Sequence, residues 1–219
     1  MALALFAHPF ASYCQKALIA LYENATPFTY RMLGPETPES FAELSRLWPL
    51  KKFPVLVDDG RVVIEATIII EHLQLFHPGP VRLIPDDPRD ALGVRFLDRF
   101  HDNYVMTPMQ QIVADALRSE EARDSRTVAD ARAQLEVAYR WLDERMHGRQ
   151  WASGDAFTLA DCAAAPALFY ADWVHPIDAG LAHTRAYRSR LLARPSVART
   201  VEEARPYRHL FPLGAPERD

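Results

Sequence analysis

The chain has 219 residues, of which 49% are hydrophobic and 25% are charged, with a formal net charge of −4 and a pI near 6.1. This is an ordinary globular composition, long enough for one or two packed domains. The acidic balance and the lack of a basic stripe with interleaved aromatics argue against nucleic-acid binding. No signal-peptide pattern and no membrane-length apolar run occur, so we expect a cytoplasmic protein that does not enter membranes.

The first part of the sequence alternates between short apolar runs and helical periodicity. Residues 2–7 form an apolar run that predicts a buried strand, which the segment His8-Pro9-Phe10 ends. Apolar residues at helical spacing predict a helix over 12–24, and residues 27–32 alternate as a second strand. A loop rich in Pro and Glu follows, and then a short helical piece over 41–47.

A hairpin is the strongest local signal in the chain. The apolar runs 55–57 and 62–64 flank Asp58-Asp59-Gly60, which is a tight-turn sequence. Pro54 precedes the first run, where a proline removes a ladder donor and is often cis. Residues 65–67 then lead into the apolar segment 68–75, as a strand leads into a helix. The order is strand, helix, strand, helix, strand, strand, helix, and its βαβ beginning implies a parallel pair.

The rest of the chain is predicted to be helical. Residues 77–88 are rich in Pro and Gly, which predicts an interdomain linker, and helical stripes without strand alternation follow. Thr158 and Asp161 form an S/T-x-x-D capping box before the apolar segment 162–170. We therefore expect an α/β domain over 1–78 and an all-α bundle over 88–219.

Two separated motifs resemble the cytosolic glutathione S-transferase family. One is the hairpin stretch with Phe53-Pro54 and Glu65-Ala66, and the other is the capping-box sequence GDAFTLAD at 154–161. The resemblance, to a bacterial, serine-type or atypical member, implies a thioredoxin-like domain that binds glutathione as co-substrate. It also implies a helical domain that lines a pocket for a small hydrophobic electrophile, and a homodimer. The chain departs from the family at Ala66, where a serine is usual.

The same resemblance implies a set of glutathione-binding residues. Lys52, two positions before Pro54, matches the basic residue that reaches the glycine carboxylate. The backbone beside Phe53-Pro54 would pair with the cysteine of glutathione. Glu65 and the Ala66 N–H, at a helix N-terminus, would hold the γ-glutamyl end. The binding set is thus Lys52, Phe53, Pro54, Glu65, Ala66 and Thr67, with Gln15 as a further contact.

The sequence leaves open which group activates the glutathione sulfur, because Ala11 occupies the position where the family usually has a serine or cysteine. A hydroxyl or a helix N-terminus beside the sulfur lowers its pKa. The candidates are Ser12, Tyr13, Cys14 and the backbone amides alone. Two of these residues have a structural role as the alternative to activation. Ser12 would be a helix N-cap, and Cys14 would be a small buried hydrophobe.

The first helix of the bundle carries polar and aromatic residues that would line the electrophile pocket. These residues are His101, Asp102, Asn103, Tyr104, Met106 and Gln110, with Tyr170, Trp173 and His175 closing the pocket from another helix. Cys14 and Cys162 lie far apart, and the eight histidines show no zinc-ligand spacing, so we expect no metal.

The resemblance implies a detoxifying transferase, and three other activities are weighed against it. A glutathione-dependent isomerase of the maleylacetoacetate type would carry a serine, serine, cysteine run that this chain lacks. A disulfide or dehydroascorbate reductase would need a cysteine at Ala11. A non-catalytic glutathione-binding or ligand-binding protein of the same fold is the third, because Ala11 and Ala66 both depart from the family pattern.

Overall fold

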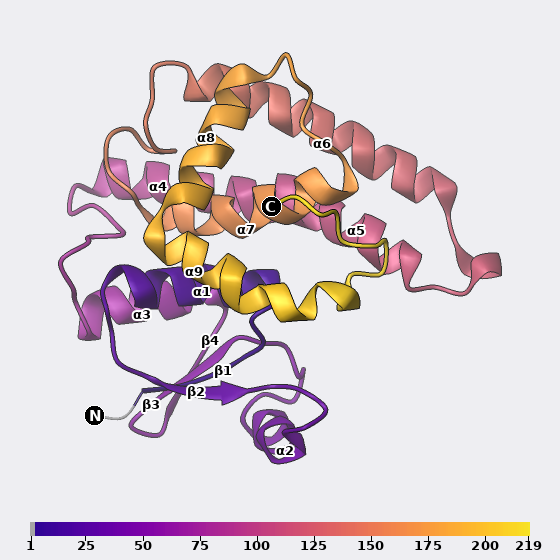
Figure 1. The fold of residues 1–219 in the computed structure, drawn as a ribbon. Helices are drawn as coiled ribbons and strands as arrows, with labels where there is room; N and C mark the ends of the chain where they lie inside the picture. Colours follow the sequence, from indigo (N-terminus) through magenta and orange to yellow (C-terminus); the bar gives the residue numbers. More distant parts are fainter. Residues whose placement is uncertain (1–2) are drawn as a thin grey trace.

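The computed structural model describes residues 3–219, which form an α/β part followed by a larger helical part (Figure 1). Ala2, which was expected in the first strand, lies outside the described residues. The helices are α1 (Ser12–Glu23), α2 (Pro38–Leu47), α3 (Ala66–Phe76), α4 (Pro88–Phe100), α5 (Thr107–Ala116), α6 (Ser125–Met146), α7 (Leu159–Val174), α8 (Ala182–Ala193) and α9 (Pro195–Ala204). A π-helical segment, η1 (His101–Met106), joins α4 to α5, and short 3₁₀ turns are η2 (Glu120–Ala122) and η3 (Arg205–Leu210). Among residues 3–219, no helix has the length and apolar character that crossing a bilayer requires.

The α/β part contains one mixed sheet. Its strands are β1 (Leu3–Ala7), β2 (Thr29–Met32), β3 (Val55–Asp58) and β4 (Arg61–Ile64), in the spatial order β2-β1-β3-β4. β1 and β2 pair in parallel, while β3 is antiparallel to both of its neighbours. In the β3–β4 turn, Asp59 and Gly60 have φ values of 45° and 87°, as a two-residue hairpin turn requires. This arrangement confirms the predicted thioredoxin-like fold.

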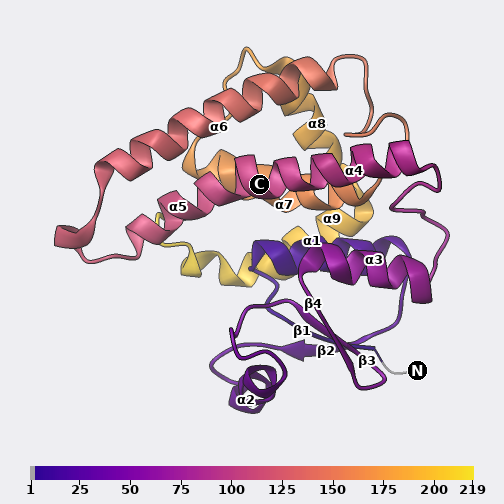
Figure 2. The same cartoon turned by 180° about the vertical axis from the view of Figure 1, so that it is seen from behind.

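Alternation along β1 decides what covers each face of the sheet. Leu3, Leu5 and Ala7 are buried in one apolar cluster with α1 and α3. Phe6 points the other way, into a small cluster with Leu44 of α2. Successive side chains of a strand face opposite sides, so one strand supports both layers. Figure 2 shows the consequence, with α1 and α3 on one side of the sheet and α2 on the other.

The helical part is built around α7. Apart from Trp173, every residue of α7 is buried, including Pro166 in its interior, and α1 packs directly against it. A helix that is apolar on all sides belongs in a protein core. The predicted capping box begins this helix: the buried Asp161 carboxylate accepts from the Thr158 N–H at 2.9 Å and from the Tyr187 hydroxyl at 2.6 Å.

Of the three helix starts in the α/β part, only that of α2 differs from the predicted position. α2 begins at Pro38, because proline is well suited to the first turn of a helix. α3 begins at Ala66, which confirms the helix N-terminus expected there, two residues before the apolar run. α1 begins at Ser12 as predicted, but Ala11 is its N-cap, so the N-cap role considered for Ser12 is wrong. The π-helical segment was not predicted, and the domain boundaries at 78 and 88 stay a prediction.

Candidate active site between the two domains

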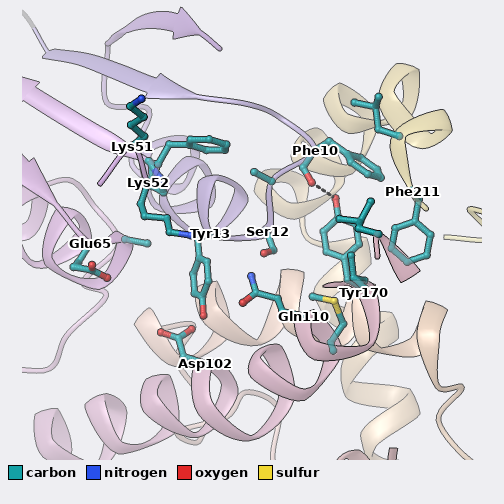
Figure 3. Close-up of a pocket in the computed structure, with 18 of the residues that line it drawn as sticks. Phe10, Ser12, Tyr13, Lys51, Lys52, Glu65, Asp102, Gln110, Tyr170 and Phe211 are labelled. Carbon is teal, nitrogen blue, oxygen red and sulfur yellow. Dashed lines mark hydrogen bonds between the residues drawn. The ribbon is translucent and has the colours of Figure 1, made fainter. Parts of the chain in front are cut away.

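A cavity of about 720 Å³ opens where the two parts of the chain meet. Figure 3 shows its walls, with the β1–α1 loop and the start of α3 on one side and helices of the second part on the other. Its lining comprises Phe10, Ala11, Ser12, Tyr13, Trp48, Lys51, Lys52, Phe53, Pro54, Glu65, Ala66, Arg99, Asp102, Asn103, Met109, Gln110, Val113, Leu117, Tyr170, Leu210, Phe211 and Pro212. Most of the residues predicted for the site are therefore brought together.

Ser12 lies at the start of α1, on the wall of the cavity. Ala11 precedes it with φ −85° and ψ 123°, and Ala11 has no side-chain oxygen with which to cap the helix. The first N–H groups of α1 therefore give this end of the cavity a partial positive charge. Within residues 3–219 the half-buried Ser12 hydroxyl makes no hydrogen bond. Ser12 thus has a donor available for a ligand.

Tyr13 is half-buried, and its ring extends toward Asp102 (Figure 3). Burial, together with the nearby Asp102 carboxylate, raises the pKa of Tyr13 to about 12. Burial likewise raises the pKa of Asp102 above its usual value, although Lys16 opposes that rise. The Tyr13 hydroxyl therefore keeps its proton near neutral pH, so it can donate a hydrogen bond but not accept a proton.

Cys14 lies in the protein core. Its side chain is fully buried in the cluster that joins α1 to the sheet, and it does not line the cavity. Burial raises the pKa of its thiol to about 12. The structure therefore places Cys14 as a small hydrophobe, away from the position that activation of a bound sulfur would need.

The loop before β3 supplies the lysines and the proline. Lys51 and Lys52 are exposed at the mouth of the cavity, and Lys51 has φ 55°. The Phe53-Pro54 peptide bond is cis, as the sequence suggested. Pro54 is buried and Phe53 half-buried, so this loop offers both cationic side chains and backbone groups to a ligand.

The start of α3 closes the same side of the cavity. Glu65 is its N-cap residue, with φ 71° and ψ 123°, and its exposed side chain lines the cavity. Ala66 opens the helix, so its N–H belongs to an anion-favouring terminus. Thr67 does not line the cavity, because its hydroxyl is hydrogen-bonded to Lys16 and Asp98, each at 2.9 Å.

Behind Thr67 lies a buried charge cluster that the sequence reasoning missed. Lys16 forms ion pairs with Asp98 at 2.6 Å and with Asp102 at 2.8 Å, and all three side chains are nearly inaccessible. Arg99 pairs with both carboxylates from the exposed side. A lysine within the apolar sequence of α1 was the available signal, because a buried charge requires a partner.

Gln15 and Tyr170, both predicted to contact ligands, also fix the β1–α1 loop. The Tyr170 hydroxyl of α7 donates to the Phe10 carbonyl at 2.8 Å, as Figure 3 shows. Gln15 is buried, and its amide donates to the Pro9 carbonyl at 2.9 Å and to the Tyr170 oxygen at 3.1 Å. Gln15 therefore holds the loop that precedes Ser12, and it does not line the cavity as a ligand contact.

The helix residues predicted for the pocket divide into two groups. Asp102, Asn103 and Gln110 line the cavity, as does Tyr170 from α7. The others do not: His101 and Met106 are buried, Tyr104 is exposed, and Trp173 and His175 lie outside the lining. The lining is apolar where α5 contributes Met109 and Val113, so the second part of the chain supplies a hydrophobic wall.

Comparisons with known proteins agree with this architecture. The family model for the glutathione S-transferase N-terminal domain matches residues 5–80, and the model for the C-terminal domain matches residues 101–195. A glutathione S-transferase-like protein from Fusarium sp is 31% identical over 155 residues, covering 70% of this chain and 68% of its own. A glutathione transferase from Zea mays is 28% identical over 153 residues, covering 68% of this chain and 63% of its own length.

The chain also resembles solved structures over nearly its whole length. A glutathione S-transferase from Methylobacterium radiotolerans, in complex with glutathione sulfonate, is 30% identical with a TM-score of 0.79, covering 92% of this chain and 95% of that one. A glutathione S-transferase from Methylobacillus flagellatus with glutathione bound has a TM-score of 0.80 at 23% identity, covering 91% and 98%. On both family models and these relatives, the chain belongs to the glutathione S-transferase family.

Proposed function

We propose that the protein is a glutathione transferase that adds the glutathione sulfur to a small hydrophobic electrophile. The observation that carries this proposal is the composition of one cavity shared by both parts of the chain. Charged and polar groups, among them Ser12, Lys52 and Glu65, gather on the thioredoxin-like side, while Met109 and Val113 line the helical side. A charged tripeptide and an apolar electrophile require these two kinds of wall.

Glutathione carries two carboxylates and one ammonium group, and the cavity offers a partner for each. Lys52 would bind the glycine carboxylate, and the Ala66 N–H at the N-terminus of α3 would bind the γ-glutamyl carboxylate. Glu65 would accept from the ammonium group. The backbone at Phe53-Pro54 would pair with the central cysteine. The relative of 30% identity that contains glutathione sulfonate supports glutathione as the ligand of this cavity.

The sulfur would then lie at the N-terminus of α1, beside Ser12. A thiolate there accepts from the Ser12 hydroxyl, and the helix terminus favours its negative charge. Lowering the thiol pKa by about two units requires roughly 2.7 kcal/mol, which one charge-assisted hydrogen bond and a helix terminus can supply. The sulfur attacks the electrophilic carbon and forms a C–S bond, and the displaced electron pair leaves with the leaving group.

The thiol pKa in the complex tests this function. We would measure glutathione binding by calorimetry and thiolate absorbance against pH in wild type, Ser12→Ala and Tyr13→Phe. We expect the wild type to lower the thiol pKa by about two units and Ser12→Ala to reverse most of that shift. Tyr13→Phe is the matched control, because Tyr13 extends toward Asp102.

Turnover of a chlorodinitrobenzene at about pH 6.5 should fall roughly a hundredfold in Ser12→Ala, following the loss of thiolate. A wild type that does not bind glutathione, or binds it with no shift in the thiol pKa, would favour a non-catalytic binding protein instead. A shift that survives in Ser12→Ala but disappears in Tyr13→Phe would assign the activation to Tyr13.

We also propose that the protein is a homodimer, as its family resemblance implies. An Arg95–Glu71 ion pair links α3 to α4. The large apolar side chains exposed on these two helices are Ile68, Leu75, Phe76, Leu92 and Phe96. A twofold interface over these helices would bury them, and sedimentation measurements test it. The cytoplasmic location and the role in detoxification stay predictions.

A further inference from the structure

Three possible metal ligands converge at the end of the β3–β4 hairpin. Asp58 ends β3, His72 lies in the last turns of α3, and His77 is the C-cap residue of that helix. Both imidazole Nε2 atoms lie 2.8 Å from the same carboxylate oxygen, Asp58 Oδ2. The histidines are 14 and 19 residues from Asp58 in sequence, so no local spacing connects them with this carboxylate.

The two imidazoles share one oxygen of the Asp58 carboxylate. A carboxylate has two oxygens, each with two lone pairs. Here both imidazoles meet at Oδ2, while the buried Oδ1 has no hydrogen-bond partner within residues 3–219. Three ligand atoms within 4.8 Å of one another are close enough to share a cation.

The geometry points to a Zn²⁺ site formed by Asp58, His72 and His77. Zn²⁺ binds imidazole nitrogen and carboxylate oxygen at about 2.0–2.2 Å, which separates neighbouring ligand atoms by roughly 3.3 Å in a tetrahedral shell. The three ligand atoms all lie within 4.8 Å of one another, so the ion fits once each 2.8 Å contact opens by about half an ångström and the two Nε2 atoms take a similar separation. A fourth position stays open to water.

The ligands are held in place before a metal binds. The His72 side chain is only 7% exposed, and its ring packs 4.7 Å from that of Phe76. The His77 N–H caps α3 by bonding to the Leu73 carbonyl. His77 and Asp58 keep 14% and 12% of their side chains accessible, which provides an entry path.

This site is independent of the proposed transferase activity. None of the three ligands lines the cavity, and they lie at the opposite end of α3 from Glu65 and Ala66. A metal here would tie the end of β3 to the end of α3. Its loss should leave glutathione affinity unchanged within about twofold, because additivity holds for distant sites.

The test is a Zn²⁺ titration of the full chain after chelator treatment and dialysis, with a chromophoric chelator as competitor. We expect one Zn²⁺ per wild-type chain, and a Tm that rises by roughly 5–10 °C at a hundred times Kd. Asp58→Asn and His77→Gln should each weaken binding at least tenfold, as loss of a ligand does. His147→Ala is the matched control, because His147 and His183 form another close histidine pair, with ring centroids 5.0 Å apart.

Co²⁺ gives a second measurement that needs no variant. Bound by these three ligands in a four-coordinate or five-coordinate shell, it should absorb visible light more strongly than aqueous Co²⁺ and lose that absorption when Zn²⁺ is added. The proposal is overturned if the wild type binds no stoichiometric Zn²⁺, or if Co²⁺ keeps its aqueous spectrum. It is also overturned if both ligand variants fold and bind Zn²⁺ like the wild type, or if His147→Ala removes the binding.

Discussion

Glu65 holds an uncommon backbone conformation at the wall of the cavity. Its φ of 71° and ψ of 123° lie in a region that side-chain-bearing residues rarely adopt. Lys51, with φ 55°, is a second such residue on the same cavity. Strain of this kind persists where the surrounding structure enforces it, and here it accompanies the two residues flanking the proposed binding loop and helix.

Two replacements of Glu65 distinguish the contribution of its side chain to binding from that of its backbone conformation to stability. Glu65→Ala and Glu65→Gly should both weaken glutathione binding about tenfold, because each removes the acceptor proposed for the ammonium group. Glu65→Gly should nevertheless be about 1 kcal/mol more stable than Glu65→Ala, since glycine adopts a positive φ without strain. Calorimetry measures the first effect and urea unfolding the second.

The exposed residue Ile68, in the first turn of α3, provides the matched comparison. At that helical position the order should reverse, with Ile68→Gly less stable than Ile68→Ala by up to about 1 kcal/mol. If glycine were the less stable replacement at both positions, the backbone of Glu65 would carry no strain.

The sequence predicted which segments form the cavity better than it predicted which of their side chains point into it. Two positions along a helix are separated by about 200° of rotation, so a Ser12 that faces the cavity places Cys14 toward the core. Thr67 likewise lies about 100° around α3 from Ala66 and turns to the buried charges. The partners of Lys16 could not be predicted, because Asp102 follows it by 86 residues and reaches it only through tertiary packing.

The π-helical segment η1 buries a histidine in the core of the helical part. His101 is fully buried, and its Nδ1 lies 2.8 Å from the Leu97 carbonyl, where it donates. Its Nε2 is buried without a partner within residues 3–219, as suits an uncharged ring. Burial lowers the pKa of His101 to about 4.

The pH dependence of stability follows from this burial. Above about pH 6.5 the imidazole is neutral in both the folded and unfolded states, so its contribution is constant. As the pH falls toward 4, the unfolded chain binds a proton that the folded chain resists, which should cost on the order of 2–3 kcal/mol. Urea unfolding at pH 7 and 4 should show a smaller loss in His101→Asn, which retains a donor but does not titrate.

The control for this effect is His209→Asn, because His209 is exposed. Within residues 3–219 its ring has one hydrogen-bond partner, the carbonyl of the nearby Pro206. That variant should lose as much stability as the wild type between the two pH values. An equal loss in His101→Asn and the wild type would mean that burial does not lower the pKa of His101.

Helices and strands could be told apart in the sequence because the spacing of apolar residues follows the buried face of each element. The capping box located the start of α7, and the hairpin turn located β3 and β4. The start of α2 was placed late, because its first residues, Pro38-Glu39-Ser40, are not apolar side chains at helical spacing. The π-helical segment left no local pattern in the sequence, since its extra residue is accommodated by packing against neighbouring helices.

At the scale of the whole molecule, buried polar contacts join the two parts of the chain as well as apolar packing. α1 of the first part packs on α7 of the second, with Gln15 bonded to Tyr170. Farther along α1, Glu23 forms an ion pair with Arg194 at 2.6 Å. The sequence predicted two parts and their order, but their mutual placement depends on pairs of distant residues that no local pattern reveals.

The Lys16 cluster should therefore control the stability of the assembled chain. Lys16→Met preserves volume but leaves Asp98 and Asp102 buried without their shared cation, which typically costs about 3–5 kcal/mol. Arg99 still faces both carboxylates from the exposed side, so we expect a loss near 3 kcal/mol in urea unfolding. Arg95→Ala, which removes a more exposed pair with Glu71, should cost at most about 1 kcal/mol. Equal losses in the two variants would show that Lys16 adds no more than a surface ion pair.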